Sequence, residues 1–291
     1  MKLSPPDIQL FYDLNFPLLF YVNGRLNLAP KIQTREDFAK SAFKIKAEAR
    51  NRLYDNINLV DEFCAENPFQ FTEKELGIIL SWKHFVRGRF IAYKQYQKYC
   101  AFLLPSETTT KIYGVLSLVS DFEEVLPFFP CYVETVLLPF KDSIIYDGLV
   151  APYQVHFGSG IRASLKELFE IAKAKYGIID KLPHVEPDGQ SDENLMRLYL
   201  KNDANRQLYE DEIDELINKD QQLLILFHRE LGKRHARQIA KRLKEKGLHK
   251  KWFAIYDEVI VASGSDRKKA EENARAILTP EELDFIHIFQ V

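Results

Sequence analysis

The stretch LLPFKDSIIYDGLV, Leu137 to Val150, contains two apolar runs that flank Lys141, Asp142 and Ser143. Asp142 favours a turn because its carboxylate can accept hydrogen bonds from nearby backbone amides, and Gly148 permits a bend or bulge after a short second strand. The stretch therefore predicts a β-hairpin with a three-residue connection. Because it also carries two carboxylates, Asp142 and Asp147, a second hypothesis is that the hairpin forms the rim of a functional site.

The hairpin belongs to a series of short segments that are rich in aromatic and β-branched residues and are separated by Pro, Ser, Asp and Gly. These segments span residues 90–96, 99–104, 112–119, 132–140, 144–146 and 153–157. Their composition and length are typical of strands. Four to six strands are enough for a small antiparallel sheet or a partly closed barrel.

Helices are predicted on both sides of this β-rich region. Residues 1–85 should form a helical layer, in which the first helix kinks or breaks near Pro17. Capping boxes that start at Thr34 and Thr72 open two further helices, the first of which should run to the breaker at residues 65–68. After the strands, Gly158–Gly160 turns the chain into an amphipathic helix that ends near Gly177.

The polar segment 183–191 contains Pro and Gly and lacks apolar periodicity, so it is a predicted linker. It separates a first domain, residues 1–182, from a second domain, residues 192–291. Around and beyond it, residues 188–215 contain nine acids and three bases, whereas residues 229–251 contain ten bases and two acids. Because these helical segments have opposite charge, we expect them to pair with each other.

The C-terminal segment predicts a hairpin at 252–264, a helix at 266–278 and an apolar strand at 285–291. Three strands and one helix make a small core, so this ββαβ unit should need the preceding helix to complete it. The chain is therefore predicted to be an α+β protein. It has a helical N-terminal layer on a small antiparallel β-sheet or barrel, followed by charged helices and the ββαβ unit.

Composition narrows the class of protein. The formal net charge of −2 over 291 residues gives the whole protein no electrostatic footprint for nucleic acid, so any such binding must come from a local basic patch. The three cysteines, Cys64, Cys100 and Cys131, lack Cys-x-x-Cys spacing, and their sparse, odd number fits a reducing compartment. The sequence contains no recognisable membrane span or signal peptide. We expect a cytoplasmic protein with no metal and no cofactor.

Two segments resemble known sequences. Trp252 and Ala254 (W-x-A), followed by a turn and Val259 to Gly264 with a V-x-A-x-G pattern, resemble a small bacterial and archaeal domain of unknown function. The central LPFKDSIIYDG is similar to stretches of uncharacterised bacterial proteins. The resemblance implies a prokaryotic protein and supplies no catalytic residues.

Two sets of residues are candidates for catalysis. Asp142, Asp147 and His156 could meet on one face of the sheet as metal ligands or as an acid–base set, although Asp142 and Asp147 also suit structural roles beside turns. Arg229 and His235 have the spacing of a pair that acts on the scissile phosphate in some helical ribonucleases. The negative charge of Glu230 opposes phosphate approach, so a solvated basic helix face is the competing interpretation.

A candidate anion site lies where Gly158, Ser159 and Gly160 lead into a helix, with Arg162 close by. Free backbone amides at a helix N-terminus can hold a phosphate or a carboxylate. The pattern is neither G-x-G-x-x-G nor a P-loop, and a plain strand-to-helix turn explains it equally well.

Two basic segments are candidates for nucleic-acid binding. In residues 83–98, bases interleave with Phe85, Phe90, Tyr93 and Tyr96, which is the composition of a stacking platform; its bases are Lys83, Arg87, Arg89, Lys94 and Lys98. The basic helix could follow a phosphate backbone through Arg234, Arg237, Lys241, Arg242 and Lys244. The alternatives are that the aromatics belong to the core and that the acidic helix neutralises the basic one.

The sequence favours a non-catalytic binding or regulatory component of a larger bacterial or archaeal assembly, with a protein partner and no membrane association. The alternatives are a nucleic-acid-binding protein that uses the two basic segments and, from a different class, a hydrolase or nuclease.

Overall fold

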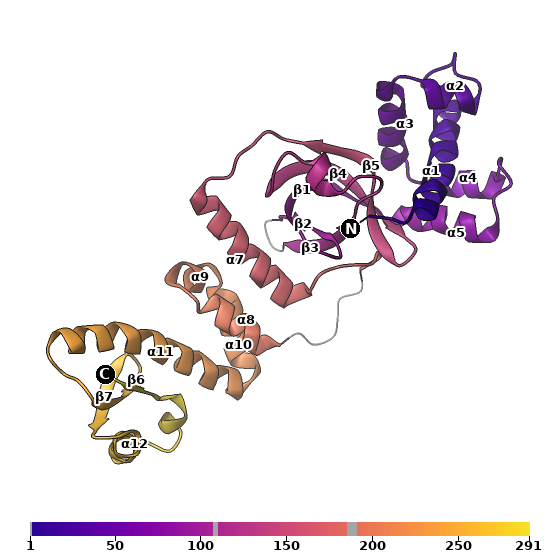
Figure 1. The fold of residues 1–291 in the computed structure, drawn as a ribbon. Coiled ribbons are helices and arrows are strands. Elements are labelled where there is room, and N and C mark those ends of the chain that lie inside the picture. The colour runs from indigo at the N-terminus through magenta and orange to yellow at the C-terminus, as the bar shows by residue number, and fades with distance from the viewer. Residues whose placement is uncertain (1, 107–109, 185–190) are drawn as a thin grey trace. The chain divides into compact units, whose positions relative to one another are not determined.

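The computed structural model describes residues 2–106, 110–184 and 191–291 (Figure 1). The chain divides into two compact units, Met1–Pro187 and Asp188–Val291. The predicted linker, residues 183–191, falls mostly on residues 185–190, which lie outside the described residues. Helices and strands are segregated along the chain, which confirms the predicted α+β class.

The first unit begins with five helices, α1 (Pro5–Arg25), α2 (Arg35–Lys40), α3 (Phe43–Asp55), α4 (Leu59–Glu66) and α5 (Glu73–Ser81), and a short 3₁₀ turn, η1 (Trp82–His84). The predicted capping box at Thr72 is confirmed, because Thr72 and Glu75 satisfy each other's backbone amides. Of the kink or break predicted near Pro17, the break is wrong: α1 runs through Pro17, whose side chain is buried.

The single helix expected from Thr34 to residues 65–68 is also wrong, since the chain forms α2, α3 and α4 instead. The Thr34 hydroxyl accepts a hydrogen bond from the Asp37 amide, as a cap should. Ser41 then leaves the helix with extended backbone and its hydroxyl donates to the Phe38 carbonyl, which ends α2 after six residues.

Five strands follow, β1 (Val86–Gln95), β2 (Cys100–Leu104), β3 (Lys111–Leu116), β4 (Cys131–Phe140) and β5 (Ser143–Pro152), with a short helix α6 (Phe122–Val125) between β3 and β4. The sheet closes on itself in the order β1-β2-β3-β5-β4. The expectation of a purely antiparallel sheet is wrong at one pairing: β5 lies parallel to β3, because α6 and β4 carry the chain across before it returns. This strand order, with a long β1 that pairs with both β2 and β4, is that of the OB-fold.

The hairpin β4–β5 differs from its prediction in two details. Phe140 pairs with Ser143, so the connection has two residues, and Lys141 takes a φ of 53° to close it. The strand continues to Pro152 instead of ending at residue 146, and the segment 153–157 lies outside any strand. Gly148 has a φ of 94° beside a register shift in the pairing with β4, which confirms the predicted bulge.

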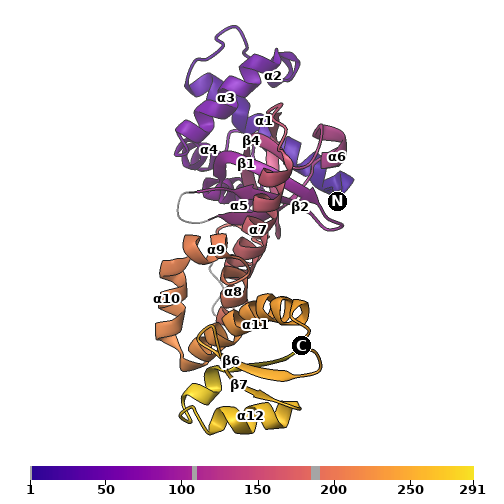
Figure 2. The ribbon, with the colours of Figure 1, turned by 90° about the vertical axis from the view of Figure 1, so that its left-hand side faces the viewer.

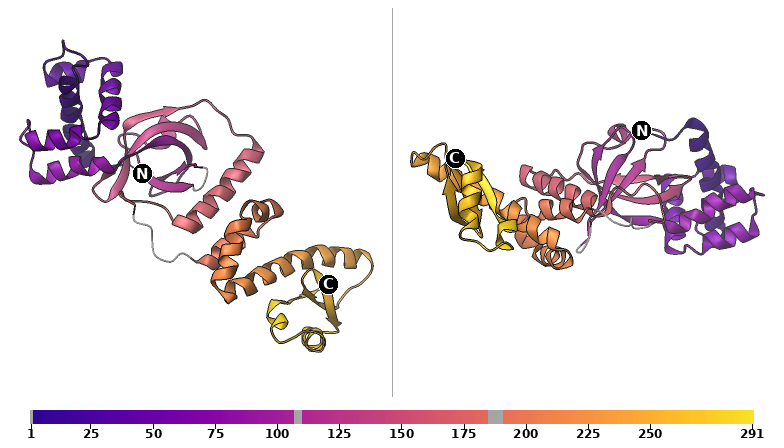
Figure 3. Two further views of the ribbon diagram at one scale, coloured as in Figure 1. Left: turned by 180° about the vertical axis from the view of Figure 1, so that it is seen from behind. Right: turned by 90° about the horizontal axis from the view of Figure 1, so that it is seen from below.

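One core joins the helical layer to the sheet. Phe11 of α1 meets the rings of Trp82 and Phe140 at centroid distances of 5.8 and 6.1 Å. Helix α7 (Ser159–Tyr176) covers the outer face of β1, β2 and β3 (Figures 1 and 3). The chain after α7 adds to the free edge of β3, where the Ile179 amide donates to Ile112 and Ile179 accepts from Gly114.

The second unit begins with four helices, α8 (Asp192–Tyr199), α9 (Asp203–Leu208), α10 (Glu210–Lys219) and α11 (Gln221–Glu245). They precede β6 (Trp252–Tyr256), β7 (Val259–Gly264), α12 (Arg267–Arg275), the 3₁₀ turn η2 (Glu282–Phe285) and β8 (His287–Gln290). The three strands are antiparallel in the order β7-β6-β8, as expected for the ββαβ unit.

Alternation along β6 explains why this sheet needs two covering helices. Phe253 and Ile255 face α11, whereas Ala254 faces α12. The two helices lie on opposite sides of the sheet (Figure 2). The preceding helix α11 therefore completes the core, as the sequence predicts. Close approach requires glycine at two positions: a Cβ on Gly264 would lie 2.4 Å from the amide nitrogen of Ala270, and one on Gly232 would lie 2.6 Å from Cβ of His287.

Candidate functional site

Asp142 lies in the turn of the β4–β5 hairpin and faces solvent. Its side chain is 90% exposed and accepts a hydrogen bond from Lys181 at 2.9 Å. That hydrogen bond lowers the pKa of Asp142. Asp142 is thus an ordinary exposed turn residue with one surface partner.

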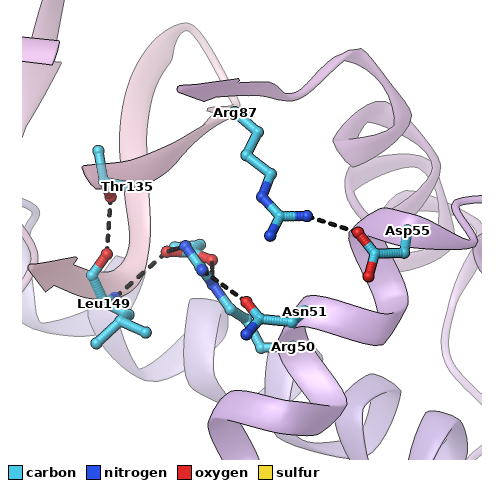
Figure 4. Close-up of polar contacts among 7 residues, drawn as sticks. Arg50, Asn51, Asp55, Arg87, Thr135 and Leu149 are labelled. Carbon is cyan, nitrogen blue, oxygen red and sulfur yellow. Dashed lines mark hydrogen bonds and ion pairs between the residues drawn. The ribbon is translucent and has the colours of Figure 1, made fainter. Parts of the chain in front are cut away.

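Asp147, five residues further on, is completely buried. Arg50 of α3 donates two hydrogen bonds to its carboxylate, from Nε to Oδ2 at 2.5 Å and from Nη2 to Oδ1 at 3.1 Å (Figure 4). The backbone amide of Leu149 donates a third hydrogen bond, to Oδ1 at 3.3 Å. Burial raises the pKa of Asp147, and the hydrogen bonds from Arg50 oppose that shift. This pair ties the helical layer to the sheet, since α3 and β5 supply one partner each.

The surroundings of the pair leave its polar atoms well satisfied. Arg50 also donates to the amide oxygen of Asn51 at 3.0 Å, and its guanidinium lies 5.5 Å from the ring of Tyr54. The hydroxyl of Thr135 holds the bulge by donating to the Leu149 carbonyl at 2.7 Å (Figure 4). The arrangement is that of a structural clamp.

His156 completes the first catalytic hypothesis, and it stacks on Phe128 at a centroid distance of 4.4 Å. Asp142, Asp147 and His156 therefore each contact a different partner and do not form one acid–base set. Within the described residues, no group of three or more His, Cys, Asp and Glu side chains is placed to hold a metal ion.

The structure separates the second catalytic pair as well. Arg229 donates from Nε to the carbonyl of Asp284 at 2.9 Å, whereas His235 lies 3.4 Å from Glu258 in the β6–β7 turn. Residues six apart on a helix point in different directions. In this chain Arg229 and His235 thus have separate partners, and their action as a phosphate-cleaving pair remains a prediction.

The predicted anion turn forms the start of α7. Gly158 occupies the N-cap without a side-chain hydrogen bond, and Arg162 donates to the carbonyl of Phe157 at 3.0 Å. A Cβ on Gly158 or Gly160 would meet nothing within 4 Å, so neither glycine serves a close approach. Binding of an anion by the backbone amides around Ser159 remains a prediction.

The stacking platform predicted at residues 83–98 is wrong, because its aromatic rings are used inside the protein. Phe90 lies in the core against Phe102, and Tyr93 and Tyr96 stack on Phe169 of α7 at 4.8 and 6.2 Å. Phe85 packs on Tyr54 at 4.9 Å. In OB-folds the β2–β3 face binds oligonucleotides; here α7 covers it.

Four of the five bases of the same segment contact another side chain, and the fifth, Lys98, is exposed. Lys83 pairs with Asp61 at 2.6 Å, Arg87 with Asp55 at 2.7 Å, and Arg89 lies 3.8 Å from Glu134. The ammonium of Lys94 lies over the ring of Tyr96 at 5.4 Å. This surface therefore offers little free positive charge to a phosphate backbone.

The N-terminal half of α11 is paired with the acidic helices, as expected. Arg234 contacts Asp203 at 2.5 Å, and Glu230 contacts Arg197 at 3.7 Å and Lys233 at 2.6 Å. Helices α8 and α10 both pack on α11. Arg234 is thus the last base of α11 that forms an ion pair with the acidic segment.

The C-terminal half of α11 and the loop after it behave differently. In the part of the chain that the structure describes, no acidic side chain lies within 4.0 Å of these bases, and all of them are exposed; they are Arg237, Lys241, Arg242, Lys244, Lys246, Lys250 and Lys251. Ile239, Ala240 and Leu243 between them face the core. The sequence showed that these residues are basic, but only the structure shows which bases of α11 form ion pairs and which do not.

Sequence reasoning missed a groove in the helical layer of the first unit. It has a volume of about 950 Å³ and lies between α1, α2 and the loop that carries Phe69. Aromatic rings form much of its wall, and the only sequence signal was the unusual number of aromatics in α1.

Among the described residues, no helix is long and apolar enough to span a membrane.

Comparisons with known proteins add no relative: no family model, no curated protein and no solved structure matches the chain.

Proposed function

We propose that the protein is a non-catalytic component of a prokaryotic assembly that binds nucleic acid through the C-terminal half of α11. The observation that supports this function is the division of the basic helix. Lys233 and Arg234 have acidic partners and Arg229 donates to a backbone carbonyl, whereas the seven bases from Arg237 to Lys251 are exposed and have no acidic partner in the described residues.

The spacing of these bases suits a phosphate backbone. Arg237, Lys241 and Lys244 are four and three residues apart, so they form a stripe about 10 Å long on one side of the helix. Arg242 and Lys246 form a second stripe beside it. Lysine and arginine contacts to phosphate supply most of sequence-independent nucleic-acid affinity.

The competing explanation is that basic residues merely stabilise a helix C-terminus through the helix dipole. That effect is confined to the last turn, which contains Arg242 and Lys244. It does not explain Arg237 and Lys241 further back, nor Lys250 and Lys251 after the helix. The hydrolase or nuclease alternative has no converged set of catalytic side chains to support it.

The test is a charge-reversal variant, K241E/R242E/K244E, in a binding assay with a short fluorescein-labelled DNA duplex at low salt. The matched control is K31E/K40E/K44E, which reverses three exposed bases of the first unit and changes the net charge equally. We expect the α11 variant to lose binding and the control to retain most of it. Equal affinity of the α11 variant and the wild type would refute the proposal.

A further inference from the structure

The groove of the first unit has an aromatic wall that is not closed by the protein itself. Tyr12, Phe16 and Phe20 follow one another at four-residue spacing on α1, so they line one side of the helix. Tyr12 and Phe16 stack at 5.5 Å, and Phe20 lies 6.5 Å from Phe69. All four of these rings are partly exposed. Partly exposed aromatic rings gathered in a concave site are typical of binding surfaces.

The groove continues along α1 beyond this point. A second hollow of about 470 Å³ shares Phe20, Gln33 and Phe69 with the first and extends to Arg25. From Gln9 to Arg25 the helix rises about 24 Å, which is the length of an extended peptide of about seven residues. The shape therefore fits an extended segment better than a compact small molecule.

The charges at the rim favour a basic occupant. Asp13 and Glu36 both line the groove, and neither has a basic side chain within 4.0 Å in the described part of the chain. The two nearby cations are already engaged, Arg35 over the ring of Phe69 at 5.1 Å and Lys46 with the carbonyl of Ala39 at 2.7 Å. The position of Arg35 also illustrates that these ring faces accept a guanidinium.

We propose that this groove binds an extended segment of a partner protein that carries Arg or Lys between apolar residues. The apolar side chains would contact the rings of Tyr12, Phe16 and Phe20, and the cation would lie between Asp13 and Glu36. This surface lies in the first unit and is independent of α11, so the peptide interaction does not depend on nucleic-acid binding.

The probe is a phage-displayed library of random peptides about seven residues long, selected on the full-length wild type with counter-selection on D13N/E36Q. We expect enrichment of sequences that place Arg or Lys beside apolar residues. An enriched peptide should bind D13N/E36Q about 3- to 10-fold more weakly than the wild type, since each exposed carboxylate contributes modestly.

The matched control is E123Q/E124Q, which removes two exposed carboxylates from α6, away from the groove. It should bind the enriched peptide as the wild type does. The proposal is overturned if no peptide is enriched, if the enriched peptides lack basic residues, or if D13N/E36Q and E123Q/E124Q bind equally well.

Discussion

Replacing Arg50 with Met should destabilise the first unit far more than removing any surface ion pair. Arg50 is 12% exposed and Asp147 is 0% exposed, so the change leaves a buried carboxylate without its bidentate partner. Breaking a buried pair on one side costs about 3–5 kcal/mol. For a unit of this size, that free energy corresponds to a drop of roughly 6–20 °C in the melting temperature.

The chain supplies its own reporter for this measurement, because Trp82 is buried in the first unit and Trp252 lies in the second. In a W252F background, urea unfolding followed by tryptophan fluorescence reports the first unit alone. The control is R87M, which removes the half-exposed Arg87–Asp55 pair and should cost at most about 1 kcal/mol.

A double variant separates a clamp from a simple packing contact. R50M/D147L replaces both charges with apolar groups of similar size and should recover most of the stability that R50M loses, because no buried charge remains unpaired. The reasoning is refuted if R50M costs less than about 1 kcal/mol, or if the double variant is no more stable than R50M.

Further predictions concern the second unit, where Trp252 fluorescence in a W82F background reports unfolding. Gly264→Ala should destabilise it by about 1–3 kcal/mol because the new Cβ meets the backbone of α12; Gly160→Ala in the first unit, where the Cβ has open space, leaves Trp252 unfolding unchanged. Burial lowers the pKa of both His228 and His287 below their ordinary value of 6.5. The unfolded chain then binds more protons below that pH, so stability should fall as pH drops from about 7 to 5; a flat urea midpoint over that range would contradict this.

Local signals in the sequence predicted much of the secondary structure. The capping box at Thr72 and the bulge at Gly148 depend on neighbours within a few residues, and both formed as expected. The ββαβ order was predicted from the pattern of apolar segments. The need for α11 was predicted because a three-stranded sheet has two faces and the unit's own helix covers only one of them. The length of β5 was not predicted, because a charged residue such as Asp147 usually marks the end of a buried strand. Here Asp147 lies within the strand because Arg50, 97 residues earlier in the sequence, forms an ion pair with it.

The candidate sites depended on contacts that no local pattern encodes. Tyr93 and Tyr96 have the composition of a stacking platform, but the sequence does not say that Phe169 covers them. The same limit applies to α11: opposite charge predicted that the acidic and basic segments pair, but not how far along α11 the pairing extends. The helices that carry the acids end at Lys219, and their ion pairs with α11 reach Glu230 and Arg234.

The most direct test of nucleic-acid binding by α11 is the salt dependence of duplex affinity for the wild type and K241E/R242E/K244E. If five of the seven exposed bases each neutralise one phosphate, a plot of log K against log salt concentration has a slope of about −4.5 for the wild type. The variant loses three of those contacts, so its slope should be shallower by about 2.7. Equal slopes for the two proteins would contradict the assignment of this surface to nucleic acid.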